Sequence, residues 1–97
     1  MAIVEIARYK LAPGTDPASL AAVEHEIQHE VGPKHSGYIG RELLRAPDGS
    51  YVLIMRFENQ AAADSWNTTL FGSAAGRQLG PMVDPKSMTK ETFSTVG

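Results

Sequence analysis

Residues 51–66 constrain this chain most, because they join a short apolar run directly to the start of a helix. Residues 51–57 are apolar or aromatic apart from Arg56. A run this short and this apolar is typical of a strand covered on both faces, so we expect it near the centre of a sheet. Asn59 can cap the following helix by accepting hydrogen bonds from its free amides, and Trp66 lies two turns further on. The stretch therefore predicts a central strand with a tryptophan-bearing helix packed against it.

Three further strands are predicted from β-branched and aromatic residues, at residues 3–11, 38–46 and 89–96. Gly40 either weakens the second of these strands or marks a bulge in it. Residues 47–50, Pro-Asp-Gly-Ser, have the chemistry of a hairpin turn, with proline early and glycine where φ can be positive. The predicted sheet therefore has four strands.

A first helix is predicted to begin at Asp16-Pro17 and to stop at Gly32-Pro33. Apolar residues recur along it at helical spacing and predict one buried stripe, made of Leu20, Val23, Ile27 and Val31. The opposite face is predicted to be solvated and consists of Glu24, His25, Glu26, Gln28, His29 and Glu30.

The second helical region begins after Asn59, and glycines divide it into a piece ending at Leu70 and a shorter piece over residues 73–79. The order of elements is then β-α-β-β-α-β, the ferredoxin-like α+β arrangement of a four-stranded antiparallel sheet with both helices on one face. We expect residues 1–97 to form a single domain.

The sheet face away from the helices is predicted to be apolar, because strand alternation places Val4, Ile6, Val52 and Ile54 on it. A patch of this kind is too large to leave in water, so we predict a homodimer that packs sheet to sheet. The arginines on the strands are predicted to be strand-edge and interface charges; they are Arg8, Arg41, Arg45 and Arg56.

Charge and composition exclude several classes of protein. The net charge of −2 provides no basic surface for nucleic acid, and the absence of cysteine excludes disulfides and thiolate metal sites. No segment approaches the roughly 20 apolar residues that a membrane span needs, and no signal peptide is evident. We therefore expect a cytoplasmic protein that binds neither nucleic acid nor membrane.

The sequence of residues 35–45, the turn at 47–50 and residues 57–66 resembles the antibiotic biosynthesis monooxygenase family of dimeric α/β-barrel proteins. The likeness covers essentially the whole chain. It implies a dimer with a pocket between the sheet and the helices of each subunit. It also implies a cofactor-independent oxygenase acting on a small aromatic or phenolic substrate. The alternative on the same fold is a non-catalytic homodimer that binds a ligand or regulates.

The haem-degrading branch of this family offers a comparison at single positions. Trp66 matches its tryptophan, but Ala7 and Gly76 stand where that branch has an asparagine and a haem-ligating histidine. Without an axial ligand haem cleavage is not expected, and no cofactor is predicted. The resemblance implies a substrate pocket formed by Trp66, Tyr9, Glu5 and Ala7. Large aromatic residues usually pack in the core, which favours a core role for Trp66 over a substrate contact. Glu5 could act as a base if buried, and the alternative is a glutamate exposed at a strand edge.

Three histidines follow the spacing His-Glu-x-x-His-x-x-Gly-x-x-His, which looks like the metzincin zinc-protease signature. In that interpretation His25, His29 and His35 would bind zinc, and Glu26 would activate the bound water. Only 24 residues precede the motif, enough for one strand, whereas metzincins build most of a sheet before it. We therefore predict no metal, and a zinc protein stays an alternative.

Overall fold

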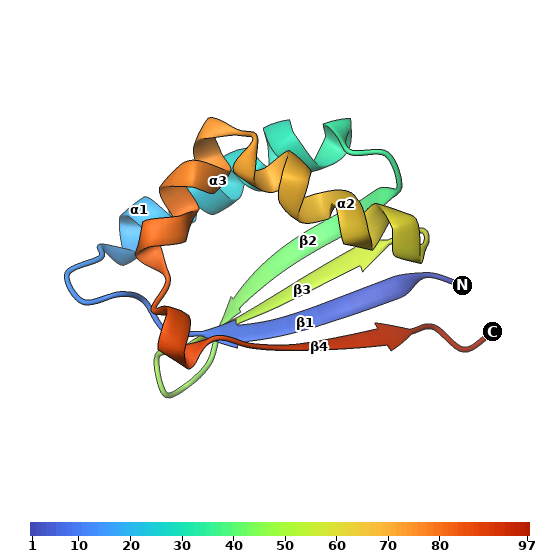
Figure 1. Cartoon of the computed structure of the whole chain (residues 1–97). Helices are drawn as coiled ribbons and strands as arrows, with labels where there is room; N and C mark the ends of the chain where they lie inside the picture. Colours follow the sequence, from blue (N-terminus) through green and yellow to red (C-terminus); the bar gives the residue numbers. More distant parts are fainter.

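Four antiparallel strands form one layer, and the helices form a second layer over one face of it, in this computed structural model, which describes residues 1–97 (Figure 1). The elements are β1 (Ile3–Tyr9), α1 (Pro17–Glu26), β2 (Tyr38–Arg45), β3 (Tyr51–Phe57), α2 (Gln60–Phe71), α3 (Ala74–Leu79) and β4 (Thr89–Ser94). The strand order is β2-β3-β1-β4, so β3 is an inner strand as predicted. The predicted ferredoxin-like α+β fold is confirmed.

The local signals in the sequence set the boundaries of most elements. The side chain of Asn59 accepts a hydrogen bond from the Ala62 amide and caps α2, as predicted. The pairing of β2 with β3 shifts register between Tyr38 and Gly40, which confirms the bulge. The first helix is less regular than expected, because α1 ends at Glu26 and continues as a π-helical turn, Ile27–Val31.

The core lies between the helices and the sheet. Phe57, Leu20 and Ile27 are its largest fully buried side chains. The predicted apolar stripe of α1 packs into this core, with Val31 at its margin. The prediction that Glu24 lies on a solvated face was wrong: its residue is only 3% exposed, because Arg41 extends from β2 beneath α1 and pairs with it.

The other face of the sheet carries no helix (Figure 1). Val4, Ile6, Val52 and Ile54 are half-buried, and Phe93 of β4 is 47% exposed. Within one chain, β3 is therefore covered on one face rather than on both. None of the helices is long and apolar enough to cross a lipid bilayer.

Candidate functional site

A cavity of about 430 Å³ lies on the helix side of the sheet. All four residues predicted for a substrate pocket, Glu5, Ala7, Tyr9 and Trp66, line it. The rest of the wall is mainly apolar and includes Leu53, Met55, Leu70, Phe71, Leu79, Val83 and Met88. The four residues predicted from the sequence thus line one cavity.

The wall contributed by β1 follows from strand alternation. Glu5, Ala7 and Tyr9 are alternate residues of one strand and therefore share a face. Ala7, in the middle, is buried and has the smallest side chain of the three. It leaves open space between two polar residues whose Cα atoms are about 13 Å apart along the strand.

Trp66 is both a core residue and part of the cavity wall. It is 3% exposed, and its ring stacks on that of Tyr38 with 5.7 Å between centroids. The rings of His35 and Phe57 lie 5.3 and 5.9 Å away. Since Trp66 also lines the cavity, its emission can report on a ligand bound there.

Glu5 is mostly buried and forms an ion pair, so it is not exposed at a strand edge. The β4 strand covers its edge of β1, and Lys90 Nζ lies 3.4 Å from Glu5 Oε2. The Glu5 side chain is 14% exposed and that of Lys90 is 52% exposed, and both line the cavity. This pair therefore forms a polar, partly solvated end of the site.

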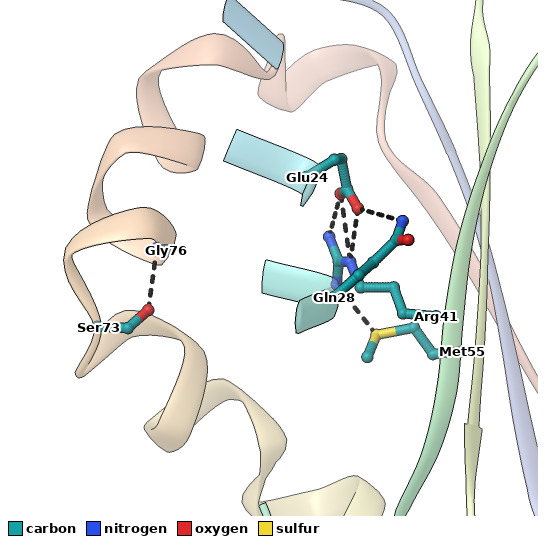
Figure 2. Close-up of polar contacts among 6 residues, drawn as sticks. All are labelled: Glu24, Gln28, Arg41, Met55, Ser73 and Gly76. Carbon is teal, nitrogen blue, oxygen red and sulfur yellow. Dashed lines mark hydrogen bonds and ion pairs between the residues drawn. The ribbon is translucent and has the colours of Figure 1, made fainter. Parts of the chain in front are cut away.

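A buried ion pair forms a second polar region (Figure 2). Arg41 Nη2 donates to Glu24 Oε1 at 2.6 Å, and Arg41 Nε donates to Glu24 Oε2 at 3.0 Å. Gln28 Nε2 donates to the same carboxylate at 3.2 Å, and Arg41 Nη1 faces the Met55 sulfur at 3.1 Å. Arg41 also lines the cavity. The prediction that Arg41 is an edge or interface charge was wrong, because its side chain turns under α1 rather than outward.

The Tyr9 hydroxyl is buried and has no hydrogen-bond partner in the protein. Burial raises the pKa of Tyr9, and the Glu24 carboxylate raises it further, while Arg41 acts in the opposite direction. Burial also raises the pKa of Tyr38. Tyr9 is therefore a neutral hydrogen-bonding group at neutral pH.

The structure does not bring the three histidines of the zinc motif together. The rings of His25 and His29 are 4.3 Å apart, and both residues are exposed on the helix. His35 turns to α2 instead, where Nε2 donates to the Ala62 carbonyl at 2.8 Å and Nδ1 accepts from the Thr69 hydroxyl at 2.7 Å. No group of three potential metal ligands forms. The zinc interpretation of His25, Glu26, His29 and His35 therefore has no site in this fold.

Gly76 is buried where α3 packs against the end of α2. A Cβ atom built at this position would overlap the Leu70 carbonyl oxygen. The Ser73 hydroxyl stabilises the corner by donating to the same carbonyl at 2.6 Å. It also accepts from the Gly76 amide at 3.0 Å (Figure 2). The backbone at this corner therefore excludes a side chain where the haem-degrading branch has its histidine.

Sequence reasoning missed three polar residues of the cavity, Arg41, Asn67 and Lys90. Lys90 faces the cavity because it pairs across the strands with Ala7. The sequence of β4 did not predict this register, because all residues of the strand are exposed and no buried face fixes its pairing. Asn67 follows Trp66 directly, but adjacent residues of a helix point in different directions, so helical geometry alone did not predict it.

No family model and no curated protein matches the sequence. Solved structures do match its fold. A predicted antibiotic biosynthesis monooxygenase from Caulobacter crescentus aligns with a TM-score of 0.80 at 21% identity, over 99% of this chain and 91% of that one. SnoaB, a cofactor-independent oxygenase from Streptomyces nogalater, aligns with a TM-score of 0.72 at 18% identity, over 99% and 94%.

A variant of MhuD with two manganese protoporphyrin IX molecules bound per active site aligns with a TM-score of 0.72 at 22% identity, over 97% of this chain and 94% of that one. Identities this low establish a common fold and leave activity open. The chain therefore has the fold of the antibiotic biosynthesis monooxygenases, as its sequence motifs implied.

Proposed function

We propose that this chain is a monooxygenase-like enzyme that oxidises a small aromatic or phenolic substrate with molecular oxygen and no cofactor. The observation that carries the proposal is the cavity of about 430 Å³, with its mainly apolar wall, Trp66 and the Glu5–Lys90 pair. Such a site suits a flat aromatic molecule with a few polar groups. The structural likeness to SnoaB supports this class of reaction.

In the proposed reaction the protein binds the substrate and transfers one proton. The Glu5 carboxylate would take a proton from the bound substrate and so make it electron-rich. Molecular oxygen then oxidises the ring carbon opposite the phenolate, which bears one hydrogen. One oxygen atom stays on that carbon as a carbonyl, and the phenolate oxygen becomes a second carbonyl. The other oxygen atom leaves as water, with the ring hydrogen and the proton that Glu5 returns. Trp66 and the apolar wall would hold the ring and keep bulk water away from it.

The second candidate is a non-catalytic homodimer that binds a ligand or regulates. The packing of Trp66 against three other rings favours it, because such packing accounts for this residue without any chemistry. In both candidates, we propose that the second copy packs on the apolar outer face of the sheet.

Oxygen consumption with a panel of phenols and quinols tests the enzyme proposal. We expect turnover by the unmodified chain and a loss of at least about 100-fold in the Glu5→Gln variant, the size of a general-base contribution. Glu26→Gln is the matched control, because Glu26 is exposed on α1 and does not line the cavity. A chain that binds phenols in the cavity but consumes no oxygen would favour the non-catalytic candidate.

A further inference from the structure

We propose that the Tyr9 hydroxyl and the Arg41 Nη1 group form a hydrogen-bonding subsite that selects the ligand. The ligand it selects is an uncharged aromatic molecule carrying a carbonyl-type oxygen. This inference rests on the proposed function, since it assigns the polar group recognised in the same cavity.

The first observation is the unpartnered hydroxyl. Proteins rarely leave a buried hydroxyl without a hydrogen bond, because removing it from water without compensation is costly. Tyr9 lines the cavity and is 2% exposed, yet no protein group bonds to its oxygen. An acceptor supplied by a ligand would satisfy it.

The second observation is the incomplete bonding of Arg41. Its Nε and Nη2 groups donate to Glu24, but Nη1 donates only to the Met55 thioether, which is a weak acceptor. Arg41 lines the same cavity as Tyr9. Two donors that lack a good acceptor thus line one mainly apolar cavity, and an oxygen atom of a ligand is an acceptor that both could use.

The charges around the cavity decide against an anionic ligand. The charged residues that line it are Glu5, Arg41 and Lys90. Glu24 does not line the cavity but pairs with Arg41. Each cation is therefore already matched by a carboxylate. A ligand carboxylate would add an unmatched negative charge close to Glu24, whereas a neutral carbonyl oxygen needs only the two hydrogen bonds.

Isothermal titration calorimetry with three probes of matched shape tells whether the cavity prefers a neutral carbonyl group, an apolar group or an anion. They are 2-acetylnaphthalene, 2-ethylnaphthalene and 2-naphthoate, which differ only in carrying a carbonyl, no oxygen or a carboxylate. We expect the acetyl compound to bind about tenfold more tightly than the ethyl compound, the value of one or two net hydrogen bonds. We expect naphthoate to bind more weakly than the acetyl compound.

Two variants, each with a control, assign the effect to the named groups. Tyr9→Phe should reduce the preference for acetyl over ethyl by at least about threefold, the loss of one of the two hydrogen bonds, while Tyr51→Phe, which changes the stacked neighbour of Tyr9, should keep it. Glu24→Gln should improve naphthoate binding at least tenfold, whereas Glu26→Gln makes the same charge change on the exposed side of α1 and should not. If Glu24→Gln does not fold, the probe series and Tyr9→Phe still decide.

The outcomes separate this inference from the proposed function. Equal binding of the acetyl and ethyl probes, or a preference that Tyr9→Phe leaves unchanged, overturns the subsite and leaves the aromatic cavity standing. Tighter binding of naphthoate than of the acetyl probe by the unmodified chain also overturns it. No binding of any probe removes the proposed function and this inference together.

Discussion

At the scale of single residues, the stability of the fold depends on the ion pair between Glu24 and Arg41. Its side chain is 5% exposed and that of Arg41 is 1% exposed, so neither charge is screened by water. Glu24→Ala would leave the guanidinium buried without a counter-charge. We expect a loss of about 3–5 kcal/mol in the free energy of unfolding, measured by urea denaturation.

Glu26→Ala is the control for helix propensity and charge, and we expect it to change stability by less than about 0.5 kcal/mol because Glu26 is exposed. A double variant, Glu24→Leu with Arg41→Met, should recover most of the loss, since apolar side chains of similar volume can replace a buried pair. Equal stability of Glu24→Ala and Glu26→Ala would mean that the pair contributes nothing.

Tyr9 gives a prediction for alkaline pH. The folded pKa of Tyr9 lies above its ordinary value of 10.0, so the folded chain keeps this proton at pH values where the unfolded chain releases it. Stability is therefore complete below about pH 10 and falls as pH rises further, by up to about 1.4 kcal/mol per pH unit. The free energy of unfolding should fall less steeply in Tyr9→Phe than in the unmodified chain.

The measurement is a series of urea denaturations between about pH 9 and about pH 11. Tyr51→Phe serves as the reference for removal of a neighbouring phenol. A slope that is the same in Tyr9→Phe and in the unmodified chain would show that Tyr9 ionises equally well in the folded and unfolded states. Below pH 9 we expect Tyr9→Phe to be at least as stable as the unmodified chain, because it removes an unbonded buried hydroxyl.

At the scale of elements, the corner between α2 and α3 depends on Gly76. Because a Cβ atom there would meet the backbone of Leu70 rather than a movable side chain, the two helices would have to separate. We expect Gly76→Ala to cost about 3 kcal/mol or more in the free energy of unfolding, measured by thermal or urea denaturation.

Gly80→Ala is the matched control, because no atom lies within 4 Å of a Cβ built at Gly80. We expect this substitution to be neutral or slightly stabilising, since it reduces the freedom of the unfolded chain. Similar stabilities for the two variants would show that the α2–α3 corner can move apart without cost.

At the scale of the whole molecule, the proposed homodimer rests on the apolar outer face of the sheet. Sedimentation at micromolar concentration should give about twice the chain mass of 10.5 kDa. Ile54→Lys places a cation in the centre of this face and should dissociate or unfold the assembly, because the charge would be buried without a partner.

Ala61→Lys adds the same charge on the exposed side of α2 and should leave the mass unchanged. A monomer mass for the unmodified chain would remove the basis of the dimer. In that case the apolar residues of the outer face would be in contact with water, and dimer formation would not account for their apolar character.

Local chemistry made most of the fold predictable. The proline and glycine signals, the Asn59 cap and the apolar run of residues 51–57 act on neighbours within a few positions, so the sequence determined the element order and the sheet architecture. Strand alternation likewise placed Glu5, Ala7 and Tyr9 on one face. The resemblance of the motifs to a known family then pointed to Trp66.

Tertiary structure alone decided the polar character of the site. Glu24 and Arg41 are 17 positions apart and look like surface charges on separate elements. Only the packing of α1 over β2 brings them together and removes both from water. Lys90 reaches the cavity through the register of β4 with β1, and Gly76 is confined by the fold of α3 onto α2. These relations depend on contacts between segments that are distant in the sequence. No local sequence pattern determines the energies of such contacts.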